Sequence, residues 1–573
     1  MNEMKKWWKE SVVYQIYPKS FMDSNGDGIG DLQGILSKLD YLQDLGVDVL
    51  WLCPIYPSPN EDNGYDISDY QAIMKDFGTM DDFDKLLAEV HRRGMKLILD
   101  LVINHTSDEH PWFVESRSSR DNPKRDWYIW RKGKDGAEPN NWESIFGGSA
   151  WEYDETTGEY YLHLFTRKQP DLNWENEEVR RALYRMINWW LDKGVDGFRI
   201  DAITHIKKKP GLPDLPNPDN LPYVPSFPYH MNVEGILDWL DELRRETFDR
   251  YDIMTVGEAN GVSAEEAEKW VGEERGVFNM IFQFETIGLW NFGTGGRPDW
   301  LAYKRTMSRW QEKLEGKGWN ALFFENHDLP RSVSVWGDDG RYREKSAKAL
   351  ATLYFLMKGT PFIYQGQEIG MTNVRFPSIG DYNDVPCIQR YWKDRQAGKS
   401  HEEAMAPIWR SGRDNARTPM QWNAGPNAGF TAGTPWLKVN PNYADINVEE
   451  QRTRPDSVLN YYRALIRLRK SAPALVYGQY GLLLPDHEHV YAYTRTLDGE
   501  TYLVVVNLSD AGQTVSLSAG LDWAAAALVL DNGGLAGDPG RSAGGGGAAA
   551  SGAADGVLAL GPYDARVYRF GKK

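Results

Sequence analysis

The sequence has 573 residues, so we expect two or three domains, although an α/β barrel can run long as one unit. The apolar fraction of 41% is ordinary for a globular protein, and the formal net charge of -17 disfavours nucleic acid or an anionic membrane surface as a partner. Two cysteines cannot form a disulfide framework, the N-terminus lacks a signal-peptide core, and no apolar run approaches a bilayer span. We therefore expect a cytoplasmic protein, as a monomer or weak homodimer.

Eight short runs rich in β-branched or aromatic residues alternate with segments of helical period. Their near-continuous apolar character is typical of a parallel sheet buried on both faces. No glycine-rich phosphate turn follows the first run, so the pattern favours a (β/α)8 TIM barrel over a doubly wound sheet. The runs are SVVYQIYP (11–18), VDVLWLCPI (47–55), KLILDLVI (96–103), VDGFRIDAI (195–203), YDIMTVGEA (251–259), FNMIFQFE (278–285), NALFFENHD (320–328) and TPFIYQGQE (360–368).

Two connections are too long to be plain loops, and they define the expected domains. Residues 105–173, rich in aromatic residues, form an inserted domain B after the third strand, and about 370–454 form an insertion after the eighth. The barrel then comprises 1–104 and 174–478, and the hairpin pattern of 479–573 predicts a C-terminal β-sandwich domain. Within it, the low-complexity stretch from Ser542 predicts a mobile surface loop.

Ionisable residues cluster where the predicted barrel strands end, which is where barrel enzymes carry their chemistry. Asp201, Glu258 and Asp328 end the fourth, fifth and seventh strands and should meet in one mouth. Buried carboxylates are rare unless paired or used, because desolvating a charge costs several kcal/mol. An ion-paired core acid is a fair interpretation of Asp100, with Arg199 available, but a poor one for the other three.

A pair of carboxylates flanking one bond is the equipment for glycoside hydrolysis. Arg199 lies two residues before Asp201 on the same strand face and should lower its pKa, keeping it ionised as a nucleophile. Glu258 has no adjacent basic residue, so its pKa should rise, as a general acid requires.

Several ordered motifs resemble those of glycoside hydrolase family 13, the α-amylase family. The segments QPDLN and GRDNARTPMQW further resemble its branch of oligo-1,6-glucosidases and bacterial α-glucosidases. The motifs are DLVINH (100–105), QPDLN (169–173), GFRIDAITH (197–205), GEAN (257–260), FFENHD (323–328) and GRDNARTPMQW (412–422).

The resemblance implies an exo-acting, retaining α-glucosidase that needs no organic cofactor and acts on small oligosaccharides. Asp201 would be the nucleophile, Glu258 the acid/base, and Asp328 the carboxylate that holds the sugar 2- and 3-hydroxyls. Asp62 and Arg417 would pair across the closed end of the pocket and make the enzyme exo-acting. The other residues implied to bind the terminal glucose or line its pocket are Tyr65, His105, Phe146, Phe165, Gln169, Arg199 and His327.

The stretch FMDSNGDGIGD carries oxygen-bearing residues at EF-hand spacing but lacks the Glu expected at the twelfth position. An Asp/Asn/Gly turn capping the following helix is nearly as good an interpretation of this spacing alone. In the resembling branch, a loop here holds one structural Ca²⁺, or Mg²⁺, that takes no part in catalysis. The expected ligands are Asp23, Asn25, Asp27, the carbonyl of Ile29, and Asp31.

The residue after the nucleophile, Ala202, bears on linkage. Val is typical of this position in α-1,6-specific members of the resembling branch, whereas a small residue leaves room for the closer ring of an α-1,4-linked leaving glucose. We therefore expect maltose and short malto-oligosaccharides to be cleaved faster than isomaltose. An oligo-1,6-glucosidase is the main alternative. A sucrose isomerase, a trehalose-6-phosphate hydrolase and an inactive carbohydrate-binding relative are further ones.

Overall fold

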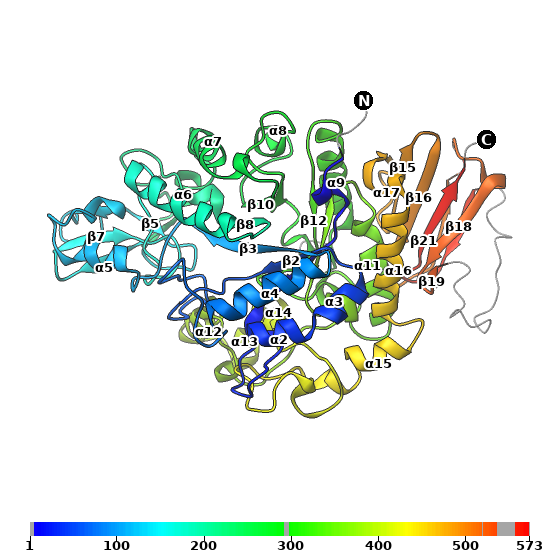
Figure 1. Ribbon diagram of the computed structural model, residues 1–573, viewed down its shortest axis with the longest axis horizontal. Helices are drawn as coiled ribbons and strands as arrows, with labels where there is room; N and C mark the ends of the chain where they lie inside the picture. Colours follow the sequence, from blue (N-terminus) through cyan, green and yellow to red (C-terminus); the bar gives the residue numbers. More distant parts are fainter. Residues whose placement is uncertain (1–4, 292–296, 518–519, 536–555, 572–573) are drawn as a thin grey trace.

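The structure is a computed structural model that describes residues 5–291, 297–517, 520–535 and 556–571. Figure 1 shows three parts along the long axis, with domain B at one end, the barrel in the middle and the C-terminal sheet at the other end. A helix-rich insertion after the last barrel strand lies along one side of the barrel. The active-site motifs all belong to the barrel, domain B and this insertion.

The central sheet has eight parallel strands, which confirms the predicted barrel. Their order is β11-β10-β8-β3-β2-β1-β13-β12, so neighbours in sequence are mostly neighbours in space. Nearly all their residues are buried, as expected for strands covered on both faces. The strands are β1 (Val13–Ile16), β2 (Val49–Leu52), β3 (Lys96–Val102), β8 (Gly197–Asp201), β10 (Met254–Ala259), β11 (Met280–Gln283), β12 (Ala321–Leu322) and β13 (Thr360–Tyr364).

Helices surround this sheet and bury their apolar faces against it (Figure 1). The stretch 32–45, whose leucine and isoleucine residues recur at helical period, forms two helices divided at Lys38, and Asp31 caps the first by accepting from the Gly34 N–H. The main helices of the barrel are α2 (Leu32–Ser37), α3 (Leu39–Leu45), α4 (Met80–Arg92), α6 (Glu177–Asp192), α7 (Ile236–Glu246), α8 (Ala267–Val271), α9 (Trp300–Lys313), α10 (Ser332–Val335), α11 (Arg343–Phe355) and α16 (Val458–Ser471).

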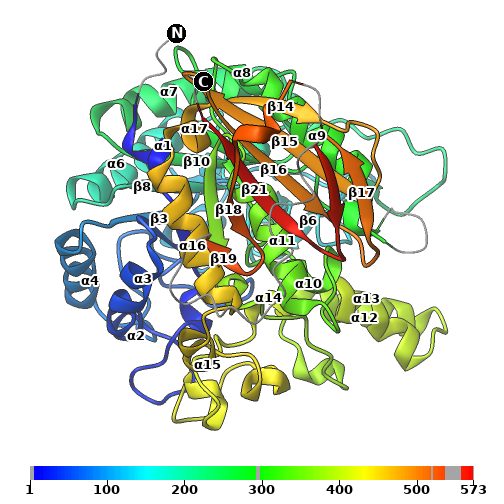
Figure 2. The ribbon, with the colours of Figure 1, turned by 90° about the vertical axis from the view of Figure 1, so that its right-hand side faces the viewer.

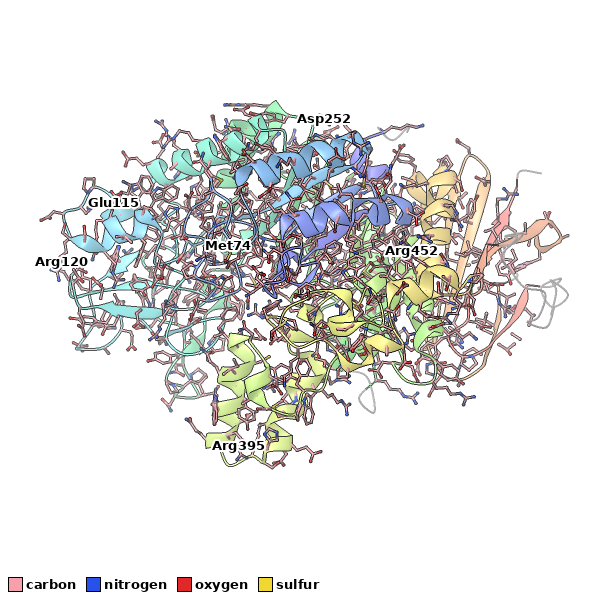
Figure 3. All side chains as sticks on the ribbon, turned by 60° about the horizontal axis from the view of Figure 1, so that its bottom comes forward. Met74, Glu115, Arg120, Asp252, Arg395 and Arg452 are labelled. Carbon is pink, nitrogen blue, oxygen red and sulfur yellow. The ribbon has the colours of Figure 1, made fainter. Side chains whose placement is uncertain are left out.

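Domain B contains α5 (Pro111–Ser118) and a three-stranded antiparallel sheet of β4 (Trp130–Arg131), β7 (Glu159–Leu162) and β6 (Trp151–Asp154). A further strand, β5 (Trp142–Glu143), pairs with β9 (Val224–Pro225), which belongs to the barrel loop after β8. The loop that follows Asp201 is therefore tied to domain B. In Figure 3, Glu115 and Arg120 project from the outer end of this domain.

The insertion after β13 is helical, with α12 (Val385–Gln396), α13 (His401–Ser411), α14 (Asp414–Arg417) and α15 (Val448–Thr453). In Figure 3, Arg395 marks the protruding end of its first two helices. The single-turn α14 carries Arg417 back to the barrel mouth, so this insertion supplies one wall of the site described below.

The C-terminal domain follows α17 (Pro473–Tyr477) and is antiparallel, as predicted (Figure 2). An apolar layer that includes Leu503, Val515 and Leu558 lies between its larger and smaller sheets. The glycine- and alanine-rich stretch from Ser542 falls almost wholly outside the described residues. The larger sheet contains β14 (Gln479–Leu483), β15 (Val490–Leu497), β16 (Glu500–Asn507), β21 (Ala565–Phe570), β18 (Ala526–Asp531) and β19 (Gly534–Leu535), and the smaller one β17 (Gln513–Ser516) and β20 (Val557–Leu560).

Within the described ranges, no helix combines the length and apolar character needed to cross a bilayer.

Candidate active site

The buried guanidinium of Arg199 organises the carboxylates at the barrel mouth. Its Nη1 donates to Asp201 Oδ1 at 2.6 Å and to Asp100 Oδ1 at 2.9 Å, and its Nη2 forms an ion pair with Glu258. The Ala202 N–H lies 3.4 Å from Glu258 Oε2. Because β8 and β10 are adjacent and parallel, their ends bring Asp201 and Glu258 together, as the sequence predicted. No basic residue is adjacent to Glu258 in the sequence, but Arg199 reaches it from the neighbouring strand.

The two carboxyl groups both have raised pKa values. Burial raises the pKa of Asp201 to about 7, with Arg199 opposing the shift and Asp100 adding to it. Burial likewise raises the pKa of Glu258 to about 7, with Arg199 opposing it and the charges of Asp201 and Asp328 adding to it. The predicted lowering at Asp201 was therefore wrong in net direction, because desolvation and nearby acids outweigh the guanidinium. Both carboxyl groups therefore keep a proton to a higher pH than ordinary carboxyl groups do.

Asp328 is surrounded by two arginines and a histidine. Arg417 Nη2 donates to its Oδ1 at 2.7 Å, Arg413 Nη1 lies 3.3 Å from the same atom, and His327 Nε2 lies 3.1 Å from Oδ2. Burial alone raises the pKa of Asp328, but His327 and the two arginines together hold it well below its usual range. Asp328 therefore loses its proton at a lower pH than either Asp201 or Glu258 does.

The closed end of the pocket differs from the prediction. Asp62 pairs with Arg413, whose Nη2 donates to Asp62 Oδ1 at 3.1 Å, and not with Arg417. Arg413 also pairs with Asp384, which is 1% exposed, and its guanidinium lies 5.2 Å from the centre of the Phe146 ring. The two arginines stand four residues apart, before and at the end of α14, and both belong to the predicted motif. Both reach Asp328, but Arg413 is the one that also pairs with Asp62 and Asp384.

Tyr65 and His327 stack with ring centres 5.0 Å apart and an interplanar angle of 3°. The Tyr65 hydroxyl donates to Asp100 Oδ2 at 2.9 Å. Gln169 Nε2 donates to Asp62 Oδ2 at 3.2 Å and lies 3.2 Å from His105 Nε2. Motifs from β3, the β2 loop and domain B thus meet at one wall.

Phe165 continues this wall. Its ring centre lies 4.9 Å from that of His105 and 5.5 Å from that of Phe146. Both phenylalanines are half-buried, and they come from domain B. The structure therefore brings together every residue predicted for the catalytic and substrate-binding site.

Ala202 follows the nucleophile position in a left-handed conformation, with φ 44° and ψ 34°, and is 5% exposed. A non-glycine residue rarely adopts this region, and for a β-branched residue it is a genuine outlier. The backbone geometry at this position therefore favours a small side chain, such as that of Ala202, over a β-branched one.

Three polar residues of the site escaped sequence reasoning. Arg413 and Asp384 close the pocket end, and Gln15, 1% exposed in β1, lies with its Nε2 2.8 Å from His327 Nδ1. A signal existed for Gln15, because an amide side chain interrupts an otherwise apolar strand. Asp384 carried no such signal, since its segment has neither period nor motif.

The loop predicted to hold a cation has the right donor chemistry for Ca²⁺ or Mg²⁺, namely carboxylate, amide and carbonyl oxygens. Its acids also stabilise the loop directly. Asp23 accepts from the N–H groups of Asn25, Gly26 and Gly28, and Asp31 accepts from Ser24. Throughout the ranges that the structure describes, no cluster of three or more His, Cys, Asp or Glu side chains is placed to hold a metal ion.

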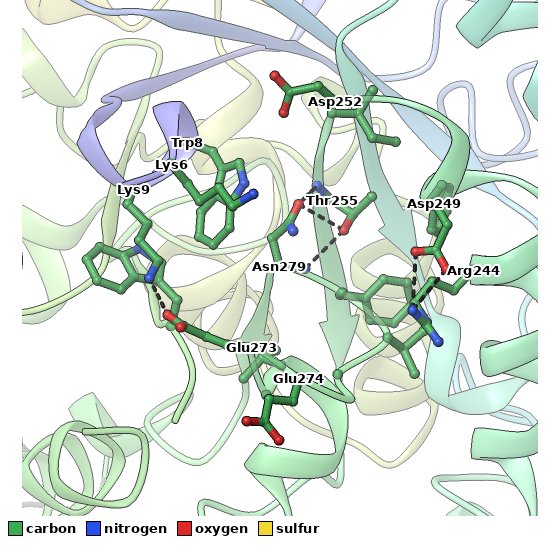
Figure 4. Close-up of a pocket in the computed structure, with 18 of the residues that line it drawn as sticks. Lys6, Trp8, Lys9, Arg244, Asp249, Asp252, Thr255, Glu273, Glu274 and Asn279 are labelled. Atoms are coloured by element: carbon green, nitrogen blue, oxygen red, sulfur yellow. Dashed lines mark hydrogen bonds and ion pairs between the residues drawn. The ribbon is translucent and has the colours of Figure 1, made fainter. Parts of the chain in front are cut away.

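A separate pocket of about 360 Å³ lies at the amino end of β10, opposite Glu258 (Figure 4). Its polar groups pair with one another, for example Arg244 with Asp249, and Thr255 with Asn279. None of the predicted site residues lines it. The pocket therefore adds nothing to the chemistry at the mouth.

Comparisons with known proteins agree with the site geometry. Residues 15–478 match the alpha amylase catalytic domain, and residues 480–531 match the maltogenic amylase C-terminal domain. The chain is 60% identical over 564 residues to probable oligo-1,6-glucosidase 3 of Bacillus subtilis (strain 168), covering 98% of this chain and 99% of that protein. It is 59% identical to the oligo-1,6-glucosidase of Parageobacillus thermoglucosidasius, covering 88% and 91%.

Solved structures of other specificities are also similar. Trehalose-6-phosphate hydrolase of Bacillus licheniformis superposes with a TM-score of 0.89 at 44% identity, covering 99% of this chain and 100% of that chain. Isomaltulose synthase SmuA from Protaminobacter rubrum superposes with a TM-score of 0.90 at 44% identity, with the same coverage of each chain.

Proposed function

We propose, on the premise that this chain belongs to the α-amylase family of glycoside hydrolases, that it is an exo-acting, retaining α-glucosidase which removes the terminal glucose from short α-1,6-linked oligosaccharides. The observation that carries the chemistry is the meeting of Asp201 and Glu258 on the Arg199 guanidinium, with the pKa of each carboxyl group raised to about 7. Such a pair supplies one ionised and one protonated carboxyl group, as glycoside hydrolysis requires.

Each carboxyl group has one role in each half of the reaction. Glu258 gives its proton to the glycosidic oxygen while Asp201 attacks C1, so the leaving sugar departs as an alcohol and glucose remains as an ester of Asp201. Glu258, now ionised, takes a proton from water, the water oxygen attacks C1, and the Asp201 carboxylate is regenerated. Two inversions give net retention, and retaining enzymes keep these groups about 5 Å apart.

Asp328 and its neighbours support a sugar-binding role at the same mouth. Two buried donors next to it, His327 Nε2 and Arg417 Nη1, find no hydrogen-bond partner among the described residues. Buried donors are rarely left unpaired, so their free N–H groups suit the hydroxyls of a bound glucose. The Asp62–Arg413 pair would hold the far end of that ring and stop a longer chain, which makes the enzyme exo-acting.

The α-1,6 preference is supported by relatives named oligo-1,6-glucosidase that are 48–60% identical over most of the chain. It replaces the sequence-based preference for maltose as the first choice. The α-1,4 preference stays as a second candidate because of one observation, the small side chain of Ala202 beside Glu258.

The deciding experiment compares kcat/KM for isomaltose and maltose with the purified protein. Isomaltose cleaved at least as well as maltose supports the proposal, and faster cleavage of maltose supports the α-1,4 candidate. NMR of fresh product should show α-glucose first, and β-glucose first would contradict retention. Product analysis on sucrose and on trehalose 6-phosphate distinguishes hydrolysis from isomerisation and tests the phosphorylated substrate.

A further inference from the structure

His327 is buried and packs against three aromatic rings. Its ring lies between two tyrosine rings, stacked on Tyr65 at 5.0 Å and 3° and on Tyr17 at 6.2 Å and 16°. The edge of Trp51 meets it at 6.2 Å and 87°. The ring is 1% exposed, and each of its nitrogens has one polar neighbour.

Nδ1 of His327 faces Gln15, and Nε2 faces Asp328. Gln15 Nε2 lies 2.8 Å from Nδ1, whereas Asp328 Oδ2 lies 3.1 Å from Nε2. Asp328 is ionised and can only accept hydrogen bonds, so Nε2 must carry a proton. If the ring is neutral, Nδ1 is then an acceptor, and Gln15 must present its amide N–H₂ to it.

The neutral ring is the favoured form. Burial lowers the pKa of His327, the positive charges of Arg199 and Arg417 lower it further, and the Asp328 carboxylate opposes them. Gln15 itself is neutral and adds no charge. A donor at Nδ1 also disfavours a second proton on the ring, since an imidazolium would place two N–H groups against each other.

We propose that Gln15 is a positioning residue that fixes the tautomer of His327, with Nδ1 as acceptor and Nε2–H directed beside Asp328 at a substrate hydroxyl. The Nε2 atom is buried and, although it lies 3.1 Å from Asp328 Oδ2, has no hydrogen-bond partner among the described residues. Its proton is thus available to a ligand. This inference rests on the proposed function only for the identity of that ligand, an α-glucoside.

The opposite tautomer shows why the assignment matters. With the proton on Nδ1, the lone pair of Nε2 would face both the Asp328 carboxylate and the sugar, and a donor would become an acceptor. With the wrong tautomer, buried polar groups would stay unpaired when the sugar binds. In a site built to bind hydroxyl groups, this lowers the affinity strongly.

The direct measurement is NMR of protein carrying ring-¹⁵N-labelled histidine, with the His327 signals assigned by their loss in His327→Asn. We expect Nδ1 of the wild type at an unprotonated and Nε2 at a protonated chemical shift across neutral pH. In Gln15→Glu, a carboxylate facing Nδ1 should draw a proton there and make both nitrogens protonated. A wild-type ring with the proton on Nδ1 would overturn the inference.

Kinetics give a second measure. Gln15→Met keeps the side-chain length but removes the donor, and we expect kcat/KM on p-nitrophenyl α-glucoside to fall about 10- to 100-fold, mainly through KM. Gln311→Met is the matched control, since Gln311 is equally buried on α9 but bonds to the backbone of Lys358, away from the site. It should lower thermal stability without moving KM.

In a His327→Asn background, Gln15→Met should add little, because the two residues act through one ring. An unchanged KM in folded Gln15→Met, or a full additional loss in the His327→Asn background, would contradict the inference. A wild type that cleaves no α-glucoside would instead contradict the proposed function, and the tautomer would still be read by NMR.

Discussion

Arg199 places one positive charge among three acids, Asp100, Asp201 and Glu258. Burial and the neighbouring acids outweigh this one guanidinium, so the pKa values of Asp201 and Glu258 are raised to about 7. Burial raises the pKa of Asp100 to about 6, and hydrogen bonds from Arg199, Tyr65 and Trp51 oppose that shift. Of the three acids, Asp201 and Glu258 therefore keep a proton to the highest pH, at the position where the reaction needs it.

Asp201→Asn is predicted to destroy activity and to stabilise the fold at alkaline pH. An amide cannot form the glycosyl ester, so kcat should fall by several orders of magnitude. The folded-state pKa of Asp201 lies above its unfolded value, so its stability contribution is present below about pH 4 and lost as pH rises through about 7. Melting temperature should therefore rise more at pH 8 than at pH 5.

The exposed Asp84 on α4 provides the control, because Asp84→Asn should leave the difference between the two pH values unchanged. An Asp201→Asn protein that melts below wild type at both pH values would show that its charge stabilises the folded state, contrary to the pKa direction.

Arg413→Lys is predicted to weaken substrate binding, whereas Arg390→Lys on the surface of α12 should leave it unchanged. The fork of Arg413 reaches Asp62, Asp384 and Asp328, and an ammonium cannot match that geometry. We expect KM for p-nitrophenyl α-glucoside to rise about 10-fold or more, since hydrogen bonds to charged groups contribute roughly 1.5–3 kcal/mol. Steady-state kinetics against Arg390→Lys, on the exposed face of α12, measures the effect; equal KM values would show that Arg413 does not contact the sugar.

At the scale of elements, the barrel was predictable because each strand is a short apolar run. The three catalytic acids were predictable because they follow the ends of three of these runs. Which arginine meets Asp62 was not predictable. Arg413 and Arg417 are one helical turn apart in the same motif, and only the position of α14 against the barrel decides their partners. The break of the 32–45 helix at Lys38 was hidden for a similar reason, since the apolar period continues across it.

The residues of the Asp23–Asp31 loop stabilise the loop and attach it to the insertion after β13, and the same residues would be able to bind a cation. Glycine is needed at Gly28, where φ is 93° and a Cβ atom would lie 1.9 Å from the Thr434 carbonyl oxygen. Asp23 also bonds to Thr431, so the loop fastens the insertion after β13 to the first barrel strand. A cation bound to the oxygen atoms of this loop would reinforce that attachment without touching the catalytic acids.

Chelation is accordingly predicted to lower the melting temperature and to leave kcat/KM at 25 °C unchanged. A metal that binds only the folded state stabilises it by mass action, by about 2.7 kcal/mol at a concentration 100 times its Kd. Calorimetry with EDTA, followed by Ca²⁺ or Mg²⁺ in excess, measures the shift. In Asp27→Asn, whose altered side chain is exposed, the shift should shrink; identical melting curves with and without EDTA in wild type would rule the metal out.

At the scale of the whole molecule, the barrel and the C-terminal sheet are joined through buried polar contacts as well as apolar packing (Figure 2). The Ser308 hydroxyl on α9 lies 2.8 Å from the Tyr480 hydroxyl, and Tyr493 donates to the Leu353 carbonyl at 2.8 Å. Such contacts fix the position of one domain on the other. None of them reaches the catalytic mouth, so the C-terminal domain supports the barrel from its outer side.

Lys304 on α9 makes the polar contact between the barrel and the C-terminal domain that is most directly testable by substitution. Its Nζ, in a side chain 1% exposed, donates to the carbonyl oxygens of Leu484, His487 and Val490, which form the turn between β14 and β15. Lys304→Met would leave these carbonyls without their donor, and each unsatisfied buried acceptor costs about 1–3 kcal/mol.

We expect Lys304→Met to lower the melting temperature by several degrees and to open a new site of limited proteolysis within residues 484–490. The value of kcat at 25 °C should stay unchanged, because this residue is remote from Asp201 and Glu258. Lys313→Met, at the exposed end of the same helix, should show neither effect. A Lys304→Met protein with wild-type stability and no new cleavage would mean that apolar packing alone holds the C-terminal sheet against α9. The polar contacts would then serve only to fix the position of the sheet on the barrel.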